Sequence, residues 1–195
     1  MLERLIRRLA VQCCEHAVLS EQDVDVFLYG MDLFLFSVLS IGAFAAAGAL
    51  TGTLPAVLCV LLFFIPLQSF GGGYHAGTHL RCFLITGGML AVCVLCGMRA
   101  NPRFLAPGVL LSALAIFRLA PVDNANAPCS TAFRARMRRV VRGACLIELA
   151  LFGVAALCSW PSAGYMGMAM VASGISMGCA TVKNAYVARA VHRKL

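Results

Sequence analysis

Six long apolar runs constrain the fold of this chain more than any other feature. They cover approximately residues 33–50, 51–70, 83–98, 104–120, 144–160 and 162–182. A helix that crosses the hydrocarbon core of a bilayer needs about 20 such residues. Hydrophobic residues make up 61% of the 195 and charged residues 12%, with a mean hydropathy of +0.87, whereas soluble domains carry roughly 25% charged residues. The sequence therefore predicts an all-α, polytopic membrane protein with about six transmembrane helices.

Two of the runs and the N-terminal segment leave alternatives open. The runs at 83–98 and 104–120 are short and bounded by arginines, which can reach the interface and let a short run span; a partial or re-entrant path is the alternative. Residues 1–25 place apolar side chains on one helical face beside arginines. That pattern predicts an amphipathic helix at the membrane surface or a soluble helix packed on the membrane part. We expect one domain over residues 1–195.

The distribution of positive charge predicts the orientation of the spans. The net charge is +8, and the Lys and Arg residues cluster beside the apolar runs, as contacts with lipid headgroups require. No nucleic-acid-binding module accompanies them. If both termini are cytoplasmic, only Arg99 and Arg103 of the 16 Lys and Arg residues lie outside. The positive-inside rule therefore places both termini, a segment at 68–82 and a basic loop at 121–143 in the cytoplasm.

Polar and titratable residues are concentrated in a short segment between two apolar runs, GGGYHAGTHLRC at residues 71–82. Such residues are costly at a membrane boundary and are candidates for function. A thiol nucleophile needs a base within hydrogen-bond reach. On one straight helix His75, His79 and Cys82 share a face, but His75 lies about 10 Å from Cys82 along the axis. A His75–Cys82 pair therefore needs a bent or non-helical segment, which the glycines permit.

Spacing alone leaves three interpretations of this segment open. Cys82 can be a nucleophile, favoured as a thiolate by the positive charge of Arg81. The histidines can instead be structural groups of an ordinary loop. His75, His79 and Cys82 can also bind a metal, because histidines four residues apart on a helix can share one, although a fourth ligand is not evident. The rival class is a small transporter or metal-binding membrane protein, but the chain shows no internal repeat or polar midplane residues, which transporters usually have.

The segment resembles the signature of the accessory gene regulator B (AgrB) family, bacterial membrane cysteine endopeptidases that process quorum-sensing propeptides. That family pairs a His and a Cys seven residues apart, as His75 and Cys82 are here. The stretch APVDNANAP at 120–128 is similar to the family's Ala-Pro loop before a basic stretch. Tyr29-Gly30-Met31-Asp32 is similar to its Tyr-Gly-x-acid element, with Asp where Glu is common. The resemblance covers nearly the whole chain.

The resemblance implies an activity, a substrate and a location. Cys82 would be the nucleophile and His75 the base, without metal or other cofactor. The substrate would be an AgrD-like propeptide with an amphipathic N-terminal helix and an acidic tail. Cleavage before the tail would leave a thioester on Cys82, and an internal Cys or Ser of the peptide would then release a thiolactone or lactone ring. The protein would lie in the bacterial cell membrane, in contact with lipids, and a second copy of the chain is a candidate partner.

Further residues are expected to contact the substrate. They are Gly71, Gly72, Gly73, Tyr74, His79, Arg81, Arg134, Arg136, Arg138, Arg139 and Glu148. The three glycines would shape a groove or donate backbone N–H groups to an oxyanion, with a plain turn as the alternative. The four arginines would attract the acidic tail, with topology and lipid contact as the alternative. Glu148 would meet an arginine or the substrate, or make an internal hydrogen bond.

Overall fold

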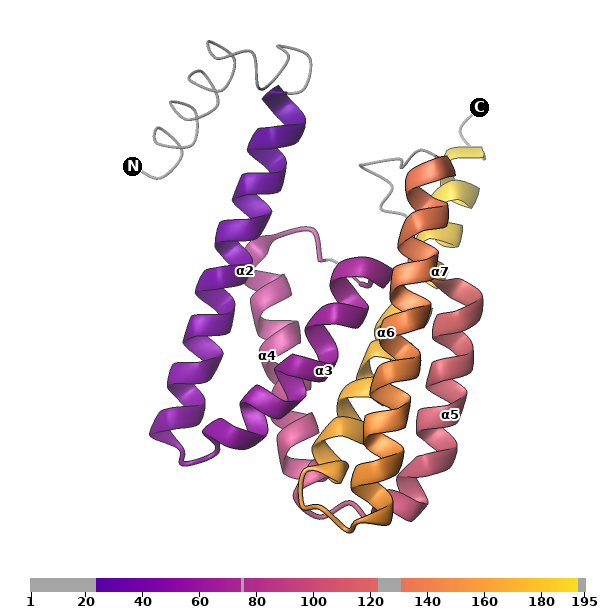
Figure 1. The fold of residues 1–195 in the computed structure, drawn as a ribbon. Coiled ribbons are helices and arrows are strands. Elements are labelled where there is room, and N and C mark those ends of the chain that lie inside the picture. Colours follow the sequence, from indigo (N-terminus) through magenta and orange to yellow (C-terminus); the bar gives the residue numbers. More distant parts are fainter. Residues whose placement is uncertain (1–23, 75, 123–130, 193–195) are drawn as a thin grey trace, which may run out of the picture. The chain divides into compact units, whose positions relative to one another are not determined.

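The computed structural model describes residues 24–74, 76–122 and 131–192, and every regular element in these ranges is a helix. The helices are α2 (Val24–Leu50), α3 (Leu54–Gly71), α4 (His79–Gly97), α5 (Pro102–Leu119), α6 (Thr131–Leu157) and α7 (Ala163–His192) (Figure 1). In this part of the chain six helices are long and apolar enough to cross a membrane. The prediction of an all-helical polytopic protein with about six spans is confirmed. The amphipathic helix predicted for residues 1–25 lies almost entirely outside the described residues.

The chain divides into two compact units, Met1–Ala46 and Ala47–Leu195. The described part of the first unit is most of α2. This helix begins at Val24, ahead of the start at residue 33 expected from the apolar run. Isolated acidic residues such as Asp32 interrupt a hydropathy run but not the backbone hydrogen bonds of a helix. The second unit contains α3 to α7 and most of the residues that the sequence indicates for function.

The two short runs form continuous helices. Helix α4 has 19 residues and α5 has 18, which correspond to about 28 and 27 Å at a rise of about 1.5 Å per residue. Each helix has a capped start: Thr78 Oγ1 accepts a hydrogen bond from the Arg81 N–H at 3.3 Å, and Asn101 Oδ1 accepts one from the Arg103 N–H at 3.0 Å. Side-chain caps satisfy backbone donors that have no partner within the helix. Both helices are therefore continuous and, in length and composition, sufficient to cross a membrane.

Helix α6 joins the basic stretch to the fifth apolar run. It is continuous over its 27 residues, about 40 Å, which exceeds the roughly 30 Å of a hydrocarbon core. The basic stretch 134–142 is thus a helical extension of this span. The segment expected as a basic loop over 121–143 is consequently helical from Thr131 onward, so its arginines have positions fixed by a helix.

Helix α7 is the central helix of the second unit and contacts α3, α4, α5 and α6 (Figure 1). Its glycines permit this close packing. A side chain on Gly164 would collide with the carbonyl oxygen of Gly97, and the Cβ of a residue replacing Gly174 would lie 2.6 Å from Ser112 Cβ. Small residues let helix backbones approach closely in membrane proteins. Helix α7 thereby brings the C-terminal part of the chain beside α3 and α4, where the candidate site lies.

Candidate active site

The segment between α3 and α4 is not helical at residues 72–74 and 76–78. Helix α3 ends at Gly71, and Gly72 has φ +71° and ψ 166° with its N–H donated to the Gln68 carbonyl oxygen at 3.0 Å. This backbone region is essentially restricted to glycine. Because α4 begins only at His79, the non-helical backbone that a His75–Cys82 pair requires is present. His75 itself lies outside the described residues, and its pairing with Cys82 stays a prediction.

The segment after α5 contacts this connection directly. The Val122 N–H donates a 2.8 Å hydrogen bond to the Gly71 carbonyl oxygen. Five residues before Val122, the Phe117 carbonyl oxygen accepts a hydrogen bond from Arg142 Nη2 of α6 at 2.9 Å. The Arg142 guanidinium lies 5.7 Å from the Phe117 ring centroid. The glycine segment, the start of the Ala-Pro stretch and the basic part of α6 therefore lie at one end of the second unit.

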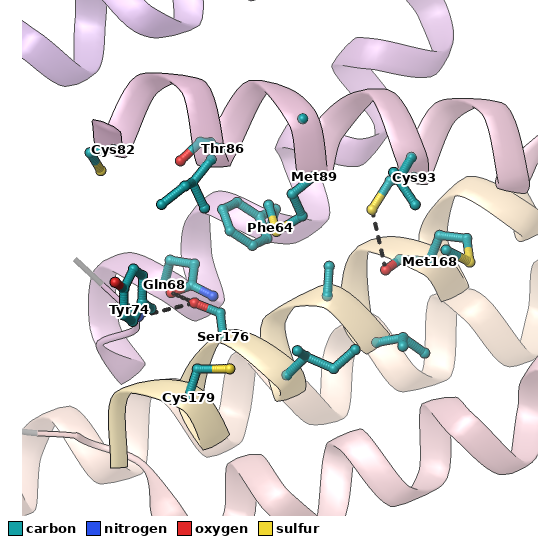
Figure 2. A pocket seen from close by; sticks show the side chains of 16 residues that line it. Phe64, Gln68, Tyr74, Cys82, Thr86, Met89, Cys93, Met168, Ser176 and Cys179 are labelled. Carbon is teal, nitrogen blue, oxygen red and sulfur yellow. Dashed lines mark hydrogen bonds between the residues drawn. The ribbon is translucent and has the colours of Figure 1, made fainter. Parts of the chain in front are cut away.

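A cavity of about 560 Å³ lies between α3, α4 and α7, and Cys82 lines it. Cys82 is a half-buried free thiol in the first turn of α4. The cavity extends along α4 from Cys82 to Cys93, about 16 Å at the helical rise. Most of its wall is apolar, with Phe64, Met89 and Ile175 among the lining side chains. The thiol therefore stands at one end of a long apolar cavity (Figure 2).

The polar groups of the cavity gather near Cys82. The Tyr74 N–H donates to Ser176 Oγ at 3.1 Å, and Ser176 Oγ donates to Gln68 Oε1 at 3.3 Å (Figure 2). Lys183 Nζ lies 5.0 Å from the centroid of the Tyr74 ring, a cation–π contact. Gln68 and Ser176 were not among the residues predicted to act. In the sequence they are visible only as polar residues inside apolar runs, Gln68 in the run at 51–70 and Ser176 in the run at 162–182.

The described site residues other than the glycines and Glu148 are distributed over three places. Tyr74 and Cys82 share the cavity. His79 and Arg81 are exposed in the first turn of α4. On α6, Arg136, Arg138 and Arg139 are exposed and Arg134 is half-buried.

Glu148 is separate from these groups in the described structure. It is buried on α6, it does not line the cavity, and its Oε2 has no hydrogen-bond partner among the described residues. The internal hydrogen bond considered for Glu148 is therefore not formed by this oxygen. Nor do three or more His, Cys, Asp or Glu side chains group around a candidate metal position in the described ranges.

The fold and the cavity define a class: a multi-pass helical membrane protein with a free thiol at the end of a cavity between its helices. The family model for accessory gene regulator B matches residues 3–182, and the chain belongs to this family. It is therefore a membrane protein of the agr quorum-sensing system, with a peptide as its substrate and a role in processing. No curated protein and no solved structure matches the chain.

Proposed function

We propose that the protein is a membrane cysteine endopeptidase that cuts a short AgrD-like propeptide before its acidic tail and promotes cyclisation of the remainder. The observation that carries the proposal is the Cys82 thiol at one end of a cavity long enough for several peptide side chains. Family membership supplies the peptide substrate and the processing role. Orientation with both termini and the 68–82 segment in the cytoplasm is part of the proposal, based on the positions of the Lys and Arg residues.

The proposed reaction begins with His75 accepting the Cys82 thiol proton. The thiolate attacks the carbonyl carbon of the peptide group before the tail, an S–C bond forms, and the C–N bond then breaks as His75 returns the proton to the leaving amine. The N-terminal part stays on Cys82 as a thioester. An internal Cys thiol of the peptide attacks that thioester and releases a thiolactone with the Cys82 thiol restored. A Ser hydroxyl would give a lactone by the same route.

Cyclisation must compete with hydrolysis of the thioester. The cavity beside Cys82 is lined mainly by apolar side chains, and exclusion of water protects reactive intermediates from side reactions. Exchange of one thioester for another conserves the acyl activation, because the bond broken and the bond formed are of the same kind. The apolar surroundings of Cys82 are thus suited to transfer of the acyl group to the peptide rather than to water.

The test is co-expression with a propeptide encoded beside the gene, followed by mass spectrometry of cleaved and cyclic products. Cys82→Ala is expected to abolish both products while the membrane protein accumulates normally. Cys96→Ala is the matched control, because Cys96 is an exposed free thiol on the same helix that does not line the cavity. Processing that survives Cys82→Ala would refute the proposal.

A further inference from the structure

The cavity that contains Cys82 has no charged side chain among the described residues that line it. Gln68, Tyr74 and Ser176, which are joined by hydrogen bonds, lie toward the Cys82 end (Figure 2). Farther along α4 and α7 the lining residues are mostly apolar, among them Met89, Val92, Met168, Val171 and Ala172. A charged group in this interior would lose its hydration without gaining a partner, which is costly. The interior is therefore suited to uncharged, apolar groups.

A thioester on Cys82 would begin at one end of this cavity. Its acyl carbonyl carbon is bonded to Sγ, and the side chain of the same peptide residue begins two bonds further on. The last residue of the retained peptide must therefore lie next to Cys82. The cavity runs about 16 Å along α4, which corresponds to roughly four to five residues of extended chain at ~3.3–3.6 Å per residue. The residues before the last one have room to follow it inward.

The tail on the other side of the cleaved bond does not fit the same space. It is acidic in the proposed substrate, and the cavity interior offers its carboxylates no cation. Positive charge lies instead beside the Cys82 end: Lys183 Nζ is 5.0 Å from the ring centroid of Tyr74, which lines the cavity. The polarity of the site thus favours the retained part inside the cavity and the tail outside it.

We propose that the cavity binds the apolar side chains of the last residues before the bond that Cys82 cuts, an inference that rests on the function proposed above. The substrate class is a peptide with large, uncharged side chains immediately before its acidic tail. Removal of these side chains from water favours binding and holds the retained part in place after the tail has left. The cavity thereby selects the position of the cut as well as the peptide.

The test measures acylation of Cys82 in the full chain in detergent micelles. The probes are the phenyl thioesters of N-acetyl-leucyl-leucine, N-acetyl-alanyl-alanine, N-acetyl-aspartyl-aspartate and decanoic acid; the Cys82 thiol takes the acyl group and thiophenol leaves. Rates at Cys82 are read by peptide mass spectrometry and divided by the rates with free N-acetylcysteine. The leucyl probe is expected to react faster than the alanyl probe by at least about tenfold, since even one methylene gives ~10–200-fold discrimination in an apolar pocket. The aspartyl probe should react most slowly.

Two changes of the cavity wall should alter this preference. Gly88 lines the cavity, and a Cβ added there meets no heavy atom within 4 Å. Gly88→Leu therefore fills part of the space and should lower the ratio of leucyl to alanyl rates several-fold. Met89→Ala enlarges the cavity and should raise the rate of an N-acetyl-phenylalanyl-phenylalanine probe relative to the leucyl probe.

Each variant has a matched control outside the cavity. Gly153→Leu adds the same side chain on α6, where a Cβ also meets no heavy atom within 4 Å. Met98→Ala truncates an exposed methionine at the end of α4. Both controls should leave the rate ratios unchanged, and alkylation of Cys82 by iodoacetamide should be equal in all variants, which shows that the thiol keeps its reactivity.

The proposal is overturned if wild-type Cys82 is alkylated but not acylated by the leucyl probe, or if the alanyl or aspartyl probe reacts as fast. It is also overturned if Gly88→Leu and Met89→Ala both leave the ratios unchanged. A decanoyl probe that reacts faster than the leucyl probe would overturn it by showing that the cavity accepts a lipid acyl chain instead. Failure of the peptidase function would appear separately, as processing that persists in Cys82→Ala.

Discussion

The carbonyl oxygen of Gly71 accepts a hydrogen bond from the Val122 N–H at 2.8 Å, which joins the end of α3 to the segment after α5. Gly71 and Val122 are far apart in the sequence. Gly71 begins the GGGYHAGTHLRC segment and Val122 lies in the Ala-Pro stretch, and both of these motifs are similar to motifs of the AgrB family. The backbone contact fixes the start of the glycine segment, three residues before Tyr74, which lines the cavity. The position of the segment that leads to Cys82 therefore depends on this contact with Val122, in the segment that follows α5.

Gly72→Ala is expected to disrupt this junction. Gly72 has a backbone conformation that other residues adopt at a cost of about 1–3 kcal/mol, and an added Cβ would collide with the Val122 carbonyl oxygen. Processing of a propeptide should fall sharply in a co-expression assay. Gly77→Ala is the matched control in the same segment, because a Cβ there meets no atom within 4 Å. Equal activity of the two variants would show that the junction does not position the site.

Gly164→Ala is expected to destabilise the second unit. The added Cβ would meet the Gly97 carbonyl group, which is backbone and cannot rotate away. Overpacking of this kind costs about 1–3 kcal/mol, so the thermal midpoint in detergent should fall. Gly153→Ala on α6 is the control, since its Cβ would have no neighbour within 4 Å. An unchanged midpoint for Gly164→Ala would contradict the close approach of α4 and α7.

Hydropathy predicted the helices well and their ends less well. A membrane-spanning run is visible in sequence because its composition must match the bilayer. The apolar runs at 33–50 and 144–160 did not show how far α2 and α6 extend, because a helix can continue past the last apolar residue: residues 24–32 and 131–143 are helical although they include acidic or basic side chains. The pattern of apolar residues does not indicate where the backbone hydrogen bonds of a helix end.

The site was predictable only in part. Cys82 was found because a thiol near two histidines is a chemical pattern within one short segment. Gln68 and Ser176 were missed because their relation is tertiary: they are 108 positions apart and meet only when α7 packs on α3. A single glutamine in an apolar run gives no indication of what its amide faces. Such groups become visible when the burial and partners of each polar atom are known.

His75 rather than His79 is expected to be the base for Cys82. His79 is exposed in the first turn of α4, whereas His75 precedes that helix and matches the family spacing. His75→Ala should lower the cleavage rate by about 10²–10⁴-fold, the usual contribution of a general base, and His79→Ala should have a much smaller effect. Rates are compared on one propeptide at equal amounts of membrane protein. Loss confined to His79→Ala would reverse the assignment.

The 68–82 segment is expected to be accessible from the cytoplasm. An introduced cysteine at Gly77, where a side chain meets open space, should react with an impermeant maleimide only after cells are permeabilised. Pro161 is exposed in the connection between α6 and α7, at the end of the second unit opposite to the 68–82 segment. A cysteine in place of Pro161 should react in intact cells. The labelled positions are mapped by mass spectrometry because native thiols are present. The reverse pattern would invert the topology inferred from the Lys and Arg residues.

Replacement of Arg136, Arg138 and Arg139 by Gln is expected to weaken binding of the acidic tail. All three side chains are exposed on the part of α6 that precedes its apolar run. Exposed ion pairs contribute only ~0–1 kcal/mol each, but several together can raise the KM for an acidic-tailed peptide while kcat stays nearly constant, as loss of uniform binding predicts. The dependence of KM on salt should also flatten, because salt screens exposed charges.

The matched control for this triple variant is Arg99→Gln with Arg103→Gln, which removes exposed positive charge at the other end of the second unit. That change should leave KM and its salt dependence unaltered, since the proposed peptide tail does not reach this end. The maleimide assay must first show that the triple variant keeps its orientation, because the same arginines contribute to topology. With orientation retained, an unchanged KM at low salt would mean that these arginines contact lipid headgroups rather than substrate.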